Sequence, residues 1–478
     1  MKRKKVVVIG AGPAGLTAGV ELLATEKFEI TILEKDSVVG GIAKTTDYKG
    51  YKFDIGPHHY ITDSPKIEKW WIDLMGDDFI KLNRFTRIFY KKRFFNYPLQ
   101  ALNVIKGLNL FECTFCVFSY FKYRFSPIKK VKSFQDWVTN RFGKRLFNIF
   151  FKTYTEKVWG IKCSELSAEW AAERIKTFSM SKAIFYAFFG KWFKKNAPRT
   201  LSTKFYYPMF GSGTLWNKVA SNFLSESNSK ISNNESVVKI EHNNYKVLAV
   251  NTISSLIKSG VNNLKRYETD YMFSSMPLKA LILSLDPVPS AEIVQAANFL
   301  KYRALVTVNL VVNKKDIFPD HWLYIHDESV KMGRIGNMNN FSKYLVANEN
   351  HTALSLEYFT YVDGEFWNKS DSELLNIGKK ELEDIGIAKQ SDIVDGMILR
   401  CPKAYPVYDD NYKKSLSVIF DYLSNFSNLK LMGRNGLHRY DNMDQAMLAA
   451  MRVVDEVCEF EKLNISRDVK KTYSESSL

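Results

Sequence analysis

The feature that most constrains this chain is a glycine motif directly after its first apolar run. Residues 6–9, Val-Val-Val-Ile, lead into Gly10-Ala-Gly12-Pro-Ala-Gly15. In such a pattern the first glycine permits a tight turn, the second lets the backbone approach a pyrophosphate, and the third allows a helix to pack closely against the strand. The N-terminus of that helix attracts the pyrophosphate charge. The motif therefore predicts a strand–helix–strand unit that binds a dinucleotide.

A second apolar run completes this unit. Residues 30–33, Ile-Thr-Ile-Leu, end on Glu34, about 20 residues after the glycines, where an acid that binds a ribose is expected. Gly40 and Gly41 follow a few residues later. The predicted cofactor contacts in this part of the chain are Gly10, Gly12, Pro13, Ala14, Gly15, Glu34, Lys35, Gly41 and Ile42.

The net charge of the chain indicates which classes of partner it can bind. Lysines and arginines number 68 against 51 acids, which gives a formal net charge of +17. Such an excess suits anionic partners, namely nucleotide diphosphates, an anionic membrane face or nucleic acid. Because no basic repeat, zinc-ligand spacing or nucleic-acid-binding motif accompanies the charge, we expect no nucleic acid partner.

Cysteine content and hydropathy bear on the compartment. Five cysteines in 478 residues are few and odd in number, which is typical of a reducing cytosol. Cys113 and Cys116 lie in an apolar, helix-like run, so we expect neither a metal site nor a redox role for them. No apolar run reaches the roughly 18 residues of a membrane span. We predict a cytoplasmic protein, either soluble or peripheral to the inner face of the membrane.

Changes in periodicity along the chain predict three parts of an α/β fold. The first is a discontinuous Rossmann-like domain, the second an inserted helical domain with few glycines, and the third an antiparallel substrate-binding sheet with alternating apolar and polar positions. The predicted boundaries are 1–80, 201–275 and 401–462 for the first part, 97–200 for the second, 81–96 and 276–400 for the third, and 463–478 for a disordered tail.

One stretch of the helical part leaves two interpretations open. Residues 181–195 combine aromatic side chains with a cationic end. Packing against the core or a partner is the favoured interpretation, but such a helix also suits a membrane surface. A peripheral membrane contact and a homo-oligomer therefore both remain open.

Two apolar runs after residue 200 are expected to return the chain to the sheet of the glycine motif. They are residues 236–240 and 271–276, and the polar stretch 225–235 separates the first of them from a preceding helix. We assign Val238, on the first run, to the cofactor site.

A second glycine turn lies near the C-terminus. A short strand leads into Gly433-Arg434-Asn-Gly, and a helix that begins with Asp444 and Gln445 follows. Backbone N–H groups at such a turn can bind an anion. The predicted cofactor contacts here are Gly433, Arg434, Asp444 and Gln445.

Several of these segments together resemble one group of proteins. Glu34 with Gly40-Gly41 resembles the extended FAD fingerprint of the glutathione-reductase-like flavoproteins. Four further segments are similar to the UDP-galactopyranose mutases and occur in that family's order. They are Gly56-Pro-His58, residues 90–98, Tyr154-Thr-Glu-Lys-Val-Trp159-Gly160, and Tyr405-Pro-Val together with Gly433-Arg434. The stretch from Gly433-Arg434 to Asn442-Met-Asp-Gln445 resembles the eukaryotic-type members of that family and protoporphyrinogen-oxidase-like proteins.

The resemblance implies a fold, a cofactor and a reaction. It implies an FAD domain, a helical insertion and a six-stranded type of antiparallel sheet over the flavin. It also implies a nucleotide-diphosphate sugar as substrate and a pyranose-to-furanose ring contraction in surface polysaccharide biosynthesis. In that reaction N5 of the reduced flavin attacks the anomeric carbon and expels the diphosphate, with no net redox change.

Five positions carry the catalytic and substrate-binding roles that the resemblance implies. His58 would lie against the flavin and Trp159 would line the nucleotide-sugar cleft. Tyr405 would contact the diphosphate, which Arg303 and Arg334 would grip between their guanidinium groups.

The chain also departs from the family at two of its phosphate contacts. Phe178 occupies the position of a second diphosphate arginine, so either Lys176 or Arg174 substitutes for it or the sugar donor is bound in another way. Met332 occupies the position of a tyrosine. The identity of the sugar and of the nucleotide therefore stays open.

Two other classes of function compete with the mutase. One is an FAD-dependent oxidase or desaturase of the protoporphyrinogen or amine oxidase type. The other is a catalytically silent flavin-binding protein that works as a membrane-associated partner. None of the three requires a metal, and we predict none.

Overall fold

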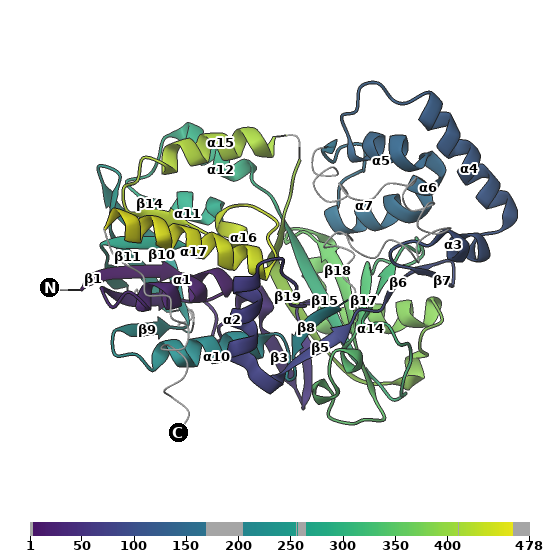
Figure 1. Cartoon of the computed structure of the whole chain (residues 1–478), viewed down its shortest axis with the longest axis horizontal. Helices are drawn as coiled ribbons and strands as arrows, with labels where there is room; N and C mark the ends of the chain where they lie inside the picture. Colours follow the sequence, from purple (N-terminus) through teal and green to yellow (C-terminus); the bar gives the residue numbers. More distant parts are fainter. Residues whose placement is uncertain (1–2, 169–203, 255, 257–263, 410, 462–478) are drawn as a thin grey trace.

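The computed structural model describes residues 3–168, 204–254, 256, 264–409 and 411–461. Three parts are visible in Figure 1. A parallel sheet covered by helices forms one half of the molecule, a large antiparallel sheet lies beside it, and a group of helices projects at the far end of that second sheet. This is the mixed α/β architecture that the periodicity predicts.

The first part is built on a five-stranded parallel sheet in the order β20-β13-β1-β2-β9. In β1, alternate side chains enter two different cores: Val6 and Val8 face one core, and Val7 and Ile9 face the other. An apolar run without alternation is typical of such a strand, because both faces of the sheet are covered. The strands are β1 (Lys4–Ile9), β2 (Phe28–Leu33), β9 (Ser229–Ser232), β13 (Tyr271–Ser274) and β20 (Leu429–Leu431).

Helices cover both faces of this sheet. One core joins the sheet to α1 (Pro13–Leu23), α2 (Pro65–Met75), α10 (Gly213–Leu224) and α17 (Met443–Phe460). The other core joins it to α11 (Leu278–Ser284), α12 (Ala291–Phe299), α15 (Tyr412–Leu423) and a small second sheet. The predicted boundary at residue 276 therefore differs from the structure, because α11 and α12 pack with the parallel sheet and not with the antiparallel one.

The small second sheet corrects one expectation. The predicted strand 236–240 lies in β10, which pairs with β11 and β14 and not with the sheet of the glycine motif. The strand that joins that sheet is β9, from the stretch expected to be only a polar linker. Because β9 is a short edge strand with the sequence Ser-Lys-Ile-Ser, it carries no apolar signal. The four strands are β10 (Glu235–Asn243), β11 (Lys246–Ser254), β12 (Lys265–Glu268) and β14 (Leu285–Asp286).

The large sheet has seven strands in the order β19-β15-β18-β17-β16-β6-β7. Its pairings are antiparallel except that β16 runs parallel to β6, so the sheet differs from the expected six-stranded type. The hairpin β6–β7 forms one edge of this sheet, whereas residues 81–83 lie in β5 (Phe79–Asn83) and pair with β8 (Lys204–Pro208). The strands are β6 (Thr86–Tyr90), β7 (Arg93–Asn96), β15 (Tyr302–Val312), β16 (Trp322–Ile325), β17 (Arg334–Asn337), β18 (Thr352–Thr360) and β19 (Ile393–Pro406).

Further elements complete this part of the molecule. Leu374 and Leu382 of α14 pack against apolar side chains of β15 and β18. Two short antiparallel strand pairs also belong here, and side chains of β4 and β8 share an apolar cluster with β15, β16 and β18. These elements are α13 (Glu365–Asn368), α14 (Asp371–Asp384), β3 (Thr45–Tyr48) with β4 (Tyr51–Asp54), and β5 (Phe79–Asn83) with β8 (Lys204–Pro208).

A group of helices follows the β6–β7 hairpin in the chain. It contains α3 (Ala101–Gly107), α4 (Leu110–Phe125), α5 (Phe134–Phe142), α6 (Lys144–Phe147) and α7 (Thr153–Trp159). The aromatic stretch 181–195 and positions 174, 176 and 178 lie outside the described residues, as does the expected tail 463–478. Within the described ranges, none of the helices combines the length and the apolar character that crossing a bilayer requires.

Candidate functional site: a dinucleotide-type cavity beside a buried arginine cluster

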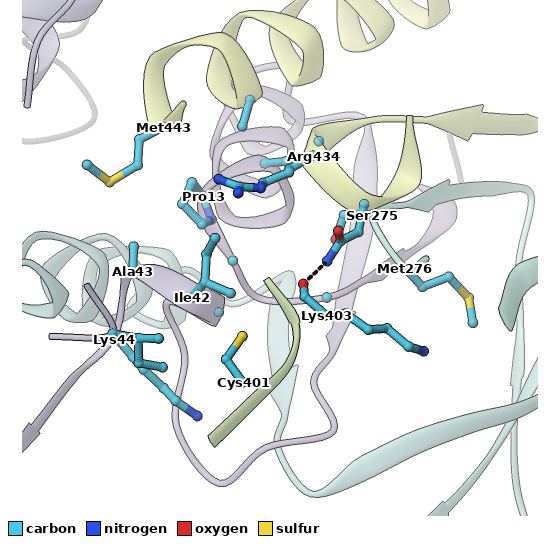
Figure 2. A pocket seen from close by; sticks show the side chains of 18 of the residues that line it. Pro13, Ile42, Ala43, Lys44, Ser275, Met276, Cys401, Lys403, Arg434 and Met443 are labelled. Carbon is cyan, nitrogen blue, oxygen red and sulfur yellow. Dashed lines mark hydrogen bonds between the residues drawn. The ribbon is translucent and has the colours of Figure 1, made fainter. Parts of the chain in front are cut away.

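A cavity of about 450 Å³ lies at the carboxyl ends of β1 and β2. In Figure 2 the side chain of Arg434 lies beside Pro13, and Ile42, Cys401 and Lys403 are drawn around the same space. This is the edge of a parallel sheet at which ligands bind in open α/β folds. The predicted residues that line it are Gly10, Gly12, Pro13, Ala14, Glu34, Lys35, Gly41, Ile42, His58, Gly433, Arg434 and Asp444.

The glycine motif forms the floor of the cavity. Gly10 has a φ of +97°, in the region that side chains avoid. A Cβ on Gly15 would lie 1.8 Å from the carbonyl oxygen of Gly10, so helix α1 can approach the turn only with a glycine there. Gly15 itself supports the floor but does not line the cavity. No side chain of the described residues caps α1, whose first-turn N–H groups therefore suit an anion.

Glu34 ends β2 with its carboxylate at the cavity wall. One carboxylate oxygen accepts a hydrogen bond from the N–H of Ala11 at 2.8 Å, and the other accepts one from the N–H of Asp36 at 2.9 Å. Burial raises the pKa of Glu34, although these two hydrogen bonds oppose the shift. Each oxygen keeps a second lone pair, so the carboxylate can still accept hydroxyl groups of a ribose.

Arg434 provides the strongest indication that the cavity binds a ligand. Its guanidinium carbon lies 4.2 Å from the ring centre of Tyr440 and 4.7 Å from that of Tyr405. Nε and Nη2 are buried and find no hydrogen-bond partner among the described residues. Buried donors of this kind are costly unless they are satisfied. Because the side chain lies beside Pro13 in the cavity (Figure 2), an anionic or carbonyl-bearing ligand would satisfy them.

His58 lies on the turn after β4 and also lines the cavity. Burial, together with the nearby charge of Arg434, lowers the pKa of His58 to about 3, so the ring is neutral at pH 7. Its Nε2 atom is buried and lacks a hydrogen-bond partner within the part of the chain that the structure describes. The neighbouring His59 also lines the cavity, and it stacks on Trp322 with ring centres 5.2 Å apart.

A second polar cluster lies on the other side of Tyr405. Arg334 and Glu357 are direct partners across the β17–β18 pair and form a buried ion pair, with Nε of Arg334 3.1 Å from the carboxylate. Nη2 of Arg334 donates to the hydroxyl oxygen of Tyr405 at 2.9 Å. Although burial disfavours its charge, Glu357 and nearby tyrosines hold the pKa of Arg334 above its usual range.

This cluster is continuous with the cavity wall. A Cβ on Gly56 would lie 3.3 Å from the Glu357 carboxylate, which places that carboxylate directly behind the turn that carries His58. Tyr405 stacks on Tyr440 with ring centres 5.5 Å apart, and Trp159 meets the edge of both rings. Trp159 is buried among these aromatic residues, and it supports them without lining the cavity.

Arg303 has a different place from the one that the resemblance implies. Its Nε donates to the carbonyl oxygen of Val158 at 3.0 Å, and Nη2 donates to those of Lys157 and Phe359 at 3.0 and 2.7 Å. The guanidinium thus ties the end of α7 to β18 and does not line the cavity. The structure gives Arg303 a structural role where a diphosphate contact was expected.

Two further predicted contacts, Val238 and Gln445, lie next to the cavity but not on its surface. Val238 is 39% exposed, and its neighbours Ser236 and Val237 line the cavity instead. Gln445 accepts a hydrogen bond from the N–H of Asn442 at 3.0 Å and so caps α17. Asp444 does line the cavity and accepts a hydrogen bond from Thr62 at 3.1 Å.

Two residues of the site escape prediction from the sequence. Glu357 is a buried acid in the strand Leu-Ser-Leu-Glu-Tyr, where a lone charge among apolar residues signals a buried partner. Tyr440 sits in a polar turn that gives no comparable signal. Among the described residues no cluster of histidines, cysteines and acids could hold a metal ion.

The fold and the cavity define a protein with a Rossmann-like dinucleotide-binding part. The family model that matches is the NAD(P)-binding Rossmann-like domain, over residues 8–74. This match covers the glycine motif, β2, Gly41 and the turn that carries His58.

Particular known proteins are also similar. A probable UDP-galactopyranose mutase of Klebsiella pneumoniae is 25% identical over 179 residues, which are 35% of this chain and 44% of that protein. The chain thus matches less than half the length of this curated relative. A structure of reduced UDP-galactopyranose mutase superposes with a TM-score of 0.78 at 18% identity, covering 99% of this chain and 98% of the other. A putative protoporphyrinogen oxidase from Exiguobacterium sp. 255-15 follows with a TM-score of 0.73 at 14% identity, covering 96% of this chain and all of the other.

Proposed function

We propose that the cavity binds FAD. Four features support this: the helix N-terminus at the glycine floor suits the pyrophosphate, the Glu34 carboxylate suits a ribose, and the unsatisfied donors of Arg434 and the neutral ring of His58 suit the far end of the cofactor. The likeness to mutase and oxidase structures agrees with a flavin. The residues present therefore fit the group that the resemblance implies.

We infer further that the protein is a mutase acting on a nucleotide-diphosphate sugar. The observation that carries this inference is the pair of arginines on the two sides of Tyr405: Arg434 stacks on its ring and Arg334 donates to its hydroxyl. A site of two guanidinium groups and several tyrosines favours an anionic, hydroxyl-rich substrate over an apolar one. We assign the reaction to the cytoplasm and to surface polysaccharide biosynthesis.

The residues of the cluster have distinct tasks in this proposal. Because Arg334 donates to the oxygen of Tyr405, the hydroxyl hydrogen of Tyr405 is left to donate to a diphosphate oxygen. Glu357 holds the Arg334 fork in place, and burial raises the pKa of Tyr405, so its phenol stays protonated. When bound and reduced, the flavin would supply the nucleophile for the anomeric carbon.

A second candidate is an FAD-dependent oxidase or desaturase. One observation favours it: donors of Arg303 and Arg334 are already bonded within the protein, so neither arginine presents an open fork to a diphosphate. The likeness to the putative protoporphyrinogen oxidase agrees with this alternative.

The redox requirement separates the two candidates. We would incubate the FAD-loaded protein with UDP- and dTDP-hexopyranoses, with and without dithionite, and separate pyranose from furanose products. Turnover that depends on reduction and consumes no oxidant supports the mutase. Oxygen-dependent release of hydrogen peroxide with no furanose product, on an amine or hydrocarbon substrate, would assign the protein to the oxidase class.

Tyr405→Phe tests the cluster itself. The variant lacks the hydroxyl that we propose for the diphosphate, so the KM for the nucleotide sugar should rise by about tenfold while FAD stays bound. Tyr422→Phe, on the outer helix α15, is the matched control and should leave the KM unchanged. An unchanged KM in Tyr405→Phe would remove this hydroxyl from the substrate site.

A further inference from the structure

Helix α4 presents aromatic side chains to solvent. It lies at the outer edge of the helical part in Figure 1. Phe111 is 79% exposed, Phe118 is 68% exposed and Phe125 is 83% exposed, and Phe115 and Phe121 are also exposed. We call these five phenylalanines the aromatic face of α4.

The spacing places these five side chains along one side of the helix. Positions 111, 115, 118, 121 and 125 are separated by three or four residues, so they follow the helical repeat of 3.6. The side of α4 that faces the protein carries Cys116, which is buried in an apolar cluster, and Glu112, which pairs with Arg145. On the same side the hydroxyl of Ser119 accepts the N–H of Arg145 at 3.1 Å. The five phenylalanines therefore lie on the side away from these contacts, whereas an ordinary surface helix turns a polar side to solvent.

The surroundings of the aromatic face are strongly cationic. Residues 84–135 contain eleven lysines and arginines and a single acid, Glu112, which is already paired with Arg145. Exposed cations stand on α4 itself and on both flanking segments. These are Lys106, Lys122, Arg124, Lys129, Lys130 and Lys132.

This charge decides which partner the face suits. A second copy of the chain would bring the same positive charge to the contact, which opposes association at physiological ionic strength. An anionic lipid surface offers negative headgroups for the lysines and an apolar boundary for the phenylalanines. With 16 residues and cationic side chains in its last turn, α4 suits a position in the plane of the interface.

We propose that the aromatic face of α4 binds the surface of an anionic lipid bilayer. In this arrangement the phenylalanines enter the boundary between headgroups and acyl chains, while the surrounding lysines and arginines contact the headgroups. The proposal rests on α4 and its neighbours alone and is independent of the reaction that the cavity catalyses.

Vesicle binding tests this proposal with the full-length, cofactor-loaded protein. We expect it to sediment with vesicles of phosphatidylglycerol and phosphatidylcholine, and to bind vesicles of phosphatidylcholine alone at least about tenfold more weakly. Raising the salt concentration should weaken binding to the anionic vesicles. Absence of binding to anionic vesicles, or equal binding to both compositions, would overturn the proposal.

Matched variants locate the contact. Phe118→Ser with Phe125→Ser should lower the affinity at least about tenfold, because two exposed apolar side chains are lost. Phe299→Ser with Phe460→Ser, which removes two other exposed phenylalanines, should not. Lys129→Glu with Lys130→Glu should lower the affinity, and Lys413→Glu with Lys414→Glu on α15 should not. Equal loss in test and control variants would overturn the assignment to α4.

A third measurement avoids any effect of these variants on folding. Phe118→Trp keeps an aromatic side chain, and its emission should shift to the blue on addition of anionic vesicles. No shift at saturating lipid would contradict insertion of the aromatic face. Light scattering gives the mass in solution, and a dimer that Phe118→Ser with Phe125→Ser converts to a monomer would overturn the proposal and assign the face to a second copy.

Discussion

Among single residues, Arg434 supports the most direct test of the cofactor site. Replacing it with alanine removes the buried Nε and Nη2 donors that lack a partner among the described residues, so the Kd for FAD should rise about tenfold or more. Arg434→Lys keeps the charge but not the planar fork, and it should restore affinity only in part. Fluorescence titration of the apoprotein with FAD measures both values.

The control for Arg434 is Arg452→Ala on the exposed side of α17, which should leave the affinity for FAD unchanged. If Arg434→Ala bound FAD as tightly as the unchanged protein, the guanidinium would have no part in holding the cofactor. The cavity would then need another anion-binding group, such as Lys35 or Lys403, which also line it.

His326 predicts a dependence of stability on pH. Burial, with the nearby charge of Lys157, lowers the pKa of His326 to about 3, against about 6.5 in the unfolded chain. Below pH 6.5 the unfolded chain binds a proton that the folded chain does not, so stability is lost as the pH falls from about 6.5 towards 3. His326 should therefore lower the free energy of unfolding by about 2 kcal/mol at pH 5 and by little at pH 7.

The variant His326→Phe isolates this term. His326 stacks on Tyr154 with ring centres 5.1 Å apart, and a phenylalanine can keep that contact. We compare the free energy of unfolding of the variant with that of the unchanged protein at pH 5 and at pH 7, measured with urea. The advantage of the variant should be about 2 kcal/mol larger at pH 5 than at pH 7. His351→Phe is the matched control, since His351 also stacks on a tyrosine, Tyr51, but is partly open to solvent. If the difference in the free energy of unfolding between His326→Phe and the unchanged protein were the same at both pH values, His326 would not be the source of the pH dependence.

At the level of elements, Arg303 acts as a tether for α7. Its three hydrogen bonds join the carbonyl groups of Lys157 and Val158 to β18, and Arg303→Lys cannot reproduce that geometry. We expect the free energy of local opening of α7 to fall by about 2 kcal/mol. Hydrogen exchange should then be faster in residues 153–159 and unchanged in β1 and α1.

The outcome for α7 also distinguishes the two roles considered for Arg303. Arg266→Lys on the surface strand β12 serves as the control and should not alter exchange in α7. If Arg303→Lys instead raised the KM for a nucleotide sugar and left α7 protected, the arginine would be a substrate contact and the tether would be unimportant.

The difference between Arg303 and Arg434 shows what a sequence can predict at this level. The Gly433-Arg434 turn is local, and its anion-binding geometry follows from neighbouring residues. Both residues line the cavity, and their contact with a cofactor stays a prediction. Arg303 begins a strand, and its hydrogen-bond partners lie about 145 and 56 positions away. Only the packing of α7 against the sheet decides that carbonyl groups occupy its donors.

Strands also divide into those that the local sequence predicts and those that only distant packing decides. β1 is recognisable because the run Val6–Ile9 is apolar throughout and buried on both faces. β2 is recognisable because its apolar residues are buried, although Glu29 between them is exposed. β9 is an edge strand whose pairing with β2 is fixed by tertiary contact, so its polar sequence predicts a linker. Glu357 is predictable only in part. The apolar residues around it indicate that its charge is buried, but they do not indicate that Arg334 is its partner.

At the level of the whole molecule, the cavity unites segments that are far apart in the sequence. Its walls come from the glycine motif, from the turn after β4, from the end of β19 in the large sheet, and from α16 (Gly433–Gly436) with the start of α17. A ligand in this cavity therefore contacts both the parallel sheet and the antiparallel one. Binding to the folded state should stabilise the two parts together.

This coupling gives the last prediction. At a concentration of FAD about 100 times its Kd, the apoprotein should gain about 2.7 kcal/mol of stability. Hydrogen exchange should slow both around Gly10 and near Cys401 and Lys403 of β19, since these residues line the same cavity. NAD at the same concentration is the control and should protect these segments less. Protection by NAD equal to that by FAD would show that the cavity does not select a flavin, and protection confined to the glycine motif would show that the end of β19 lies outside the cofactor site.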